Sequence, residues 1–153
     1  MKGNRMLKPI LLMLALIVPT ASADEVNVTF FGQSTHLIEG DFNDKHELFG
    51  VEYIDTSGDY DTGHAVSSYV NSYNIQGYMY TYSLYSPYDA HKFRTIFTAG
   101  ATTGYKDTGG VCIIEVGELC SVLAIGVEYG KYKLVPRITL FGPALVFSLS
   151  YKF

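Results

Sequence analysis

Hydrophobic and polar residues alternate along most of the chain after residue 24, and this period of two predicts β-strands with two unlike faces. Eight such segments are expected, at residues 25–31, 48–54, 64–70, 75–85, 93–105, 121–129, 131–140 and 144–153. The final segment alternates most strictly, with one face formed by Leu145, Phe147, Leu149, Tyr151 and Phe153. The pattern therefore predicts an all-β chain, and none of these segments shows a helical period.

An even number of strands, the last of which is ten residues long and ends in Phe, favours an eight-stranded antiparallel transmembrane β-barrel of the outer membrane. Closure leaves no unpaired strand edge in lipid. Thirteen Tyr residues could form the aromatic girdles of such a barrel. Charged residues on the small-residue faces would then form a structural network in the lumen: Glu52, Glu128, Lys133 and Arg137. A soluble periplasmic sandwich is the alternative interpretation.

The first 23 residues have the features of a secretory signal peptide. A basic start with Lys2, Arg5 and Lys8 precedes a short apolar run at residues 9–18 and a small-residue cleavage site at residues 21–23. We therefore expect a single barrel domain over residues 24–153, located in the bacterial cell outer membrane. Removing the signal takes away three of the eleven Lys and Arg and none of the fifteen Asp and Glu, which changes the net charge from −4 to −7. So acidic a chain is not expected to bind nucleic acid, and we expect a monomer.

Cys112 and Cys120 lie in one predicted loop of an exported chain, so we predict a disulfide between them. Two free thiols are the alternative. No metal site is expected, because the four His residues are scattered and no other thiols could complete a zinc site.

One pair of residues could support chemistry. His36 follows the first predicted strand and Ser72 follows the third, so both would lie at the same end of a narrow barrel. An imidazole beside a hydroxyl can take its proton while the oxygen forms a new acyl bond. The alternative is that both are ordinary solvated loop residues.

Several stretches resemble the outer-membrane lipid A palmitoyltransferases, the PagP family. The stretch "STH" (34–36) resembles the Thr-Trp-His that ends the first strand in that family, and "YVNSYN" (69–74) resembles Phe-Lys-Asp-Ser-Trp-Asn. The match is closest for "FTAGATTGYKD" (97–107), which resembles Phe-Thr-Ala-Gly-Val-Thr-Ala-Arg-Asp. The resemblance also includes "FNDKHELFGVEY" (42–53) and extends over most of residues 24–153.

The resemblance implies an enzyme that transfers a palmitoyl-type chain from a phospholipid donor to a lipid A acceptor without a cofactor. The catalytic positions would be His36, Asn71 and Ser72, where Asn71 stands in place of the family's Asp. Substrate-binding positions would be Met79, Thr81 and Ser83 in the acyl pocket, with Thr81 or Ser83 near its floor in place of a family Gly. Pro136 would mark a weakly paired seam that admits the acyl chain, because proline cannot donate to a strand ladder.

These departures from the family pattern motivate a second hypothesis. The chain could be a catalytically inactive PagP-like barrel that binds a lipid or hydrophobic ligand or serves a structural role in the outer membrane. A plain structural barrel of the small OmpA or OmpX type is a third hypothesis.

Overall fold

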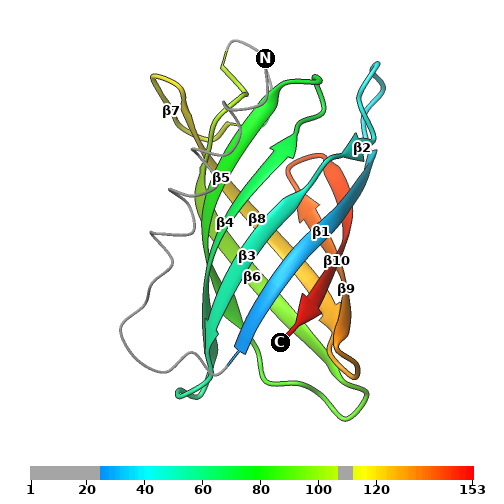
Figure 1. Ribbon diagram of the computed structural model, residues 1–153. Coiled ribbons are helices and arrows are strands. Elements are labelled where there is room, and N and C mark those ends of the chain that lie inside the picture. Colours follow the sequence, from blue (N-terminus) through cyan, green and yellow to red (C-terminus); the bar gives the residue numbers. More distant parts are fainter. Residues whose placement is uncertain (1–24, 107–111) are drawn as a thin grey trace, which may run out of the picture.

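The computed structural model describes residues 25–106 and 112–153, which form a closed antiparallel β-barrel (Figure 1). Its long strands are β1 (Glu25–His36), β3 (Phe49–Asp55), β4 (Asp61–Val70), β5 (Gln76–Tyr85), β6 (Phe93–Thr102), β8 (Leu119–Tyr129), β9 (Leu134–Phe141) and β10 (Ala144–Lys152). Two short strands, β2 (Lys45–His46) and β7 (Glu115–Val116), pair with β1 and β8. Within the described ranges, no helix is long and apolar enough to cross a membrane.

The barrel closes because the last strand pairs with the first. The long strands follow the order β10-β9-β8-β6-β5-β4-β3-β1, and β10 also pairs antiparallel with β1. The eight predicted strands, the all-β class and the closed antiparallel barrel are therefore confirmed. Figure 1 shows β2, β7 and the β4–β5 loop at one end, here called the upper rim, while the C-terminus lies towards the other end.

The alternation in sequence matches the two faces of the wall. In β5, Tyr78, Tyr80, Tyr82 and Leu84 are exposed on the outside, whereas Gly77, Thr81 and Ser83 are buried on the inside. In β10, Leu145, Phe147 and Tyr151 are likewise exposed, and Ala144, Ser148 and Ser150 are buried. On these two strands most large apolar side chains lie outside and most small or polar ones inside, while Ile54, Tyr85 and Ile96 form an apolar cluster in the interior.

Strand β1 departs from strict alternation at one point. Its pairing with β10 shifts register between Thr29 and Phe31, which is a β-bulge at Phe30. Both Phe30 and Phe31 are consequently exposed, and the following inward positions are even-numbered. Without the bulge, strict alternation would direct His36 outwards. The bulge is therefore what turns the end of β1 towards the lumen.

A charged network fills the lumen away from the upper rim. Arg137 contacts Glu52 and Glu128 at 2.8 and 2.7 Å, and Arg94 contacts Glu128 at 2.5 Å and Asp61 at 2.7 Å. Tyr85 donates to Glu52, and Lys152 pairs with Glu25. The lumen positions predicted for Glu52, Glu128 and Arg137 are correct. That for Lys133 is wrong, because this residue is exposed in the turn before β9, with its ammonium over the outward ring of Tyr151.

The pairing between β8 and β9 is short. It runs from Ala124 opposite Phe141 to Glu128 opposite Arg137 and ends beside Pro136, which pairs on its other side with Leu149 of β10. Above this ladder, the edge of β8 pairs instead with β7. Cys112 and Cys120 form the predicted disulfide at the base of this β7–β8 hairpin.

Candidate functional site

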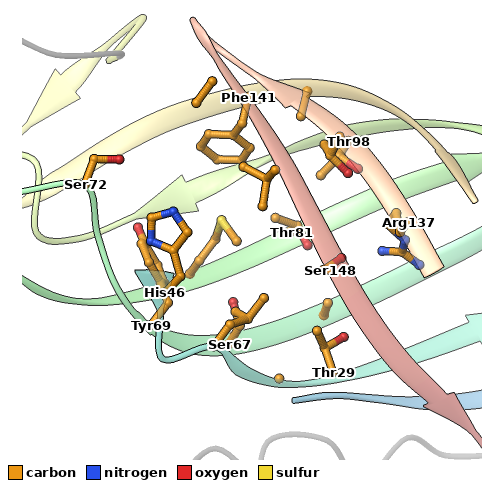
Figure 2. Close-up of a pocket in the computed structure, with 18 of the residues that line it drawn as sticks. Thr29, His46, Ser67, Tyr69, Ser72, Thr81, Thr98, Arg137, Phe141 and Ser148 are labelled. Atoms are coloured by element: carbon orange, nitrogen blue, oxygen red, sulfur yellow. The ribbon is translucent and has the colours of Figure 1, made fainter. Parts of the chain in front are cut away.

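A cavity of about 460 Å³ occupies the lumen between the upper rim and the charged network. His36 and Ser72 line it, as do Glu52 and Arg137 of the network. Figure 2 shows Ser72 and His46 towards one end, Arg137 towards the other, and Thr81 and Ser148 between them. The barrel thus encloses an elongated space with His36 and Ser72 at the rim and charged side chains at the inner end.

His36 and Ser72 meet at the mouth of this cavity. His36 is the last residue of β1, and Ser72 lies in the turn after β4. The Nε2 atom of His36 lies 2.9 Å from the Ser72 hydroxyl oxygen, and the His36 side chain is only 9% exposed. The structure therefore brings together the two residues that the sequence placed at the same rim.

A carboxylate lies on the other side of the imidazole. The Nδ1 atom of His36 is 3.3 Å from Oδ1 of Asp44, whose side chain is 59% exposed. Because a carboxylate only accepts hydrogen bonds, this contact requires a proton on Nδ1. In the neutral imidazole, Nε2 then carries the lone pair and accepts the Ser72 hydroxyl proton. The hydroxyl of Ser72, the imidazole of His36 and the carboxylate of Asp44 thus lie in series, which is the order that base-assisted attack by a hydroxyl requires.

Sequence reasoning did not identify Asp44, because it lies in the loop between β1 and β2, whose conformation the strand pattern does not specify. Asn43 fixes that loop: its backbone N–H donates to the Ser72 carbonyl at 2.8 Å, and its side chain donates to the Asn71 carbonyl at 3.2 Å. Phe42 stacks on the imidazole of His36 with ring centroids 4.2 Å apart. One feature of the sequence could have identified Asp44. It is an acidic residue eight positions after His36, in a loop that connects two neighbouring strands at the same rim.

His46 anchors the far end of this loop. Its Nδ1 atom lies 2.7 Å from the Val70 carbonyl, and its Nε2 atom lies 2.8 Å from the Ser34 hydroxyl. Since a carbonyl only accepts, Nδ1–H donates to Val70, and Nε2 accepts from Ser34 when the ring is neutral. Ser34 is 2% exposed and does not line the cavity. This second Ser–His pair therefore connects β1, β2 and β4 beneath the rim.

The side chain of Asn71 holds a turn, whereas the family resemblance implied a catalytic position for this residue. Its side chain is fully buried, and its Oδ1 atom accepts from the backbone N–H groups of Tyr73 and Ile75, each at 2.9 Å. Its Nδ2 atom donates to the carbonyl of Gly104 at 2.6 Å, where a φ of +90° favours glycine. These bonds hold the turn that presents Ser72, and they direct the Asn71 side chain to the β6 side rather than to His36.

Tyr105 adds a hydroxyl beside Ser72. This residue follows β6, lines the cavity and hydrogen-bonds through its side chain to Ser72 and Tyr69. Burial raises the pKa of the Tyr105 hydroxyl well above its usual value. The phenol therefore remains neutral and keeps a proton that it can donate. Sequence reasoning did not single out Tyr105, since one tyrosine among thirteen carries no distinguishing signal.

The predicted substrate-binding residues fall into two groups. Met79, Thr81 and Ser83 all line the cavity from β5. Pro136 is not among the lining residues and lies instead in the wall, where the β8–β9 ladder ends. Among the described residues, no group of three or more His, Cys, Asp or Glu side chains could hold a metal ion.

The order of groups from Asp44 through His36 to Ser72, at the mouth of a closed cavity, is suited to activating a serine hydroxyl against a bound ester. Comparison with known proteins identified no matching family model, no matching curated protein and no matching solved structure.

Proposed function

We propose that this chain is an outer-membrane acyltransferase of the PagP kind that transfers an acyl chain from a phospholipid to lipid A. The observation that carries the proposal is the 2.9 Å contact between His36 and Ser72 at the mouth of the lumen cavity. The cavity offers space for an acyl chain, and the rim offers a base and a nucleophile for its ester. The sequence resemblance supports the same reaction.

The outer surface supports a membrane location. Large apolar side chains are exposed on β1, β3, β5, β6, β8, β9 and β10, including Phe31, Phe97, Leu123, Ile138 and Phe147. Isolated exposed apolar residues are common on soluble proteins, but an extended apolar surface marks contact with protein or membrane. A closed barrel presents no unpaired edge to lipid. Together with the signal-like first 23 residues, these features favour the outer membrane.

The geometry supports a two-step transfer. The Ser72 hydroxyl gives its proton to Nε2 of His36 while its oxygen attacks the ester carbon of the phospholipid. The ester C–O bond then breaks, and His36 returns the proton to the leaving glycerol oxygen, which releases a lysophospholipid. In the second step, a lipid A hydroxyl gives its proton to His36 and attacks the acyl-Ser72 ester. This restores the Ser72 hydroxyl and leaves the acyl chain on lipid A.

The remaining site residues fit supporting roles. Asp44 holds the imidazole with Nδ1 protonated and stabilises the positive charge that develops on the ring. The Tyr105 hydroxyl can donate to the oxyanion of the tetrahedral intermediate, since a charged oxygen is a stronger acceptor than the neutral Tyr69 hydroxyl. The short β8–β9 ladder beside Pro136 is the entry route for the acyl chain in this proposal, because few strand bonds hold the wall there.

Mass spectrometry of lipid A tests the proposal directly. The full chain and its Ser72→Ala form would be expressed in cells that lack their own palmitoyltransferase, and folded protein would be verified in the isolated outer membrane. Ser68→Ala serves as the matched control, because Ser68 lies at the end of β4 facing away from the lumen. We expect an added acyl mass with the wild type and Ser68→Ala only. Full acylation by Ser72→Ala would contradict the assignment.

The alternative is a barrel that binds a lipid or hydrophobic ligand in the same cavity without catalysis. The observation favouring it is the 59% exposure of Asp44, which leaves the orienting carboxylate partly solvated. Replacing Asn71 with Asp cannot decide the question cleanly, since a carboxylate could not donate to Gly104. Two results together would favour this alternative. Lipid A would stay unmodified in cells that contain the folded wild-type protein, and that protein would bind the ligand.

A further inference from the structure

The middle of the cavity is lined by side-chain hydroxyls from four different strands. Ser67 comes from β4, Thr81 from β5, Thr139 from β9 and Ser148 from β10. Figure 2 shows Ser67, Thr81 and Ser148 in the region between Ser72 and Arg137. We call these four residues the hydroxyl belt. Its members lie on two parts of the wall, the adjacent strands β4 and β5 and the adjacent strands β9 and β10.

The hydroxyl belt differs from the other hydroxyls of the lumen. Ser83 and Thr98 satisfy each other at 2.8 Å, and Thr29 and Ser150 do so at 2.7 Å. Within the part of the chain that the structure describes, the belt side chains have no hydrogen-bond partner, although Ser67, Thr81 and Ser148 are each 7–8% exposed. Their hydrogen-bonding capacity is therefore directed into the cavity.

Apolar side chains such as Leu48, Met79 and Phe141 also line the cavity and suit an alkyl chain, but an unsubstituted chain leaves the belt hydroxyls unpaired. It would displace water from the belt and return no hydrogen bonds, and a buried polar group left unpaired costs free energy. The inner end is also polar, because Glu52 and Arg137 line the cavity there. A site that hydrogen-bonds a ligand hydroxyl discriminates against the analogue that lacks it.

We propose that the cavity binds an acyl chain that carries a hydroxyl group on its buried part, in preference to an unsubstituted chain of the same length. The inference deepens the proposed function by naming the class of chain and relies on the same cavity. It does not require Ser72 to be a nucleophile, because the belt lies between the rim and the charged network and contacts the chain rather than the ester.

Binding to the Ser72→Ala barrel separates this inference from the proposed reaction. The full-length refolded protein would be held in amphipol, so that no detergent competes for the cavity. The probes are stearate and a mid-chain hydroxystearate of the same length, each competing against a fluorescent fatty acid. We expect the hydroxylated chain to bind roughly tenfold more tightly. Equal or tighter binding of stearate would overturn the proposal, as would failure of both probes to bind.

Variants of the belt identify the source of the preference. The triple variant Ser67→Ala, Thr81→Val and Ser148→Ala removes three hydroxyls with little change in volume, and the preference should disappear because stearate binds more tightly. Thr62→Val is the matched control, since Thr62 lies on the outer face of β4. A preference that survives in the triple variant would overturn the role of the belt. If the triple variant fails to fold, Thr81→Val alone should reduce the preference for the hydroxylated chain. An unchanged ratio of the two probe affinities in this variant would contradict the role of the belt.

The two proposals fail differently. If lipid A stays unmodified while the hydroxylated chain binds more tightly than stearate, the acyltransferase proposal fails and the ligand class stands. If lipid A gains an acyl mass but stearate binds as well as its hydroxylated analogue, the reaction stands and the hydroxylated class is wrong.

Discussion

His36 and Ser72 are 36 residues apart in sequence, yet the imidazole Nε2 atom of one lies 2.9 Å from the hydroxyl oxygen of the other. β1 and β4 run in the same direction through the wall, so both strands end at the upper rim. β3 lies between them in the sheet, and the loop that carries Asp44 connects β1 to β2 at this rim. Two of the predictions below concern this contact, one concerns the charged network and one the bulge in β1.

Replacing Asp44 with Asn should lower the rate of acyl transfer by roughly 10²- to 10⁴-fold, because an amide can stabilise neither the Nδ1 proton nor the developing positive charge as a carboxylate does. The effect should appear in kcat rather than KM, since Asp44 is not among the residues lining the cavity. Steady-state kinetics on purified protein in mixed micelles would measure it. Asp41→Asn, an exposed acid in the same loop, is the control. Equal rates for both variants would remove Asp44 from the mechanism.

Tyr105→Phe should reduce kcat by roughly 100-fold, the order seen when one oxyanion donor is removed. Burial raises the pKa of the Tyr105 hydroxyl, so this group keeps its proton at alkaline pH and continues to donate. The variant should therefore lower activity by the same factor across the pH profile without moving its limbs. Tyr60→Phe, at an exposed position, controls for loss of a hydroxyl elsewhere. A Tyr105→Phe profile with a shifted alkaline limb would argue against a neutral donor.

Arg137→Met should destabilise the barrel by about 3–5 kcal/mol, because it leaves Glu52 and Glu128 buried without their shared partner. Reversible urea unfolding in lipid bilayers, followed by tyrosine fluorescence and gel mobility, would measure the free energy of unfolding. Lys133→Met is the matched control, since the exposed Lys133 precedes the same strand, and it should change stability by less than about 0.5 kcal/mol. Similar losses in both variants would show that the network contributes little.

Deleting Phe30 should leave His36 at the mouth of the cavity. Phe30 is the extra residue of the bulge, so its removal joins inward Thr29 to outward Phe31 and preserves alternation up to His36. Deleting Gln33 instead shifts the end of β1 by one residue and turns Ser34 and His36 outwards. Lipid A acylation should therefore persist in the first deletion and be lost in the second, with both proteins verified as folded. The reverse result would contradict the assigned position of the bulge.

The strands that form the barrel wall could be predicted from the sequence, whereas the loop residues at the upper rim could not. Strand positions and faces could be predicted because a β-strand repeats every two residues and the barrel separates an apolar outside from a polar inside. The β5 tyrosines and the β10 alternation are clear examples. Loops lack such a period, so Asp44 and the role of Asn71 in the turn could not be predicted. The predicted position of Lys133 was wrong because the alternation of a strand was extended into a turn. Strand pairing does not impose alternating side-chain directions there.

The sequence by itself determined that the chain forms eight alternating strands with His36 and Ser72 at one end, since local hydrophobic period and strand count decide both. Only the tertiary structure decided which way His36 points, because that depends on a bulge defined by pairing with β10. It also decided that Asp44 and Tyr105 lie beside His36 and Ser72 and that hydroxyls from four strands line one cavity. These relationships require barrel closure, which brings together side chains from strands and loops that carry no mutual signal in sequence.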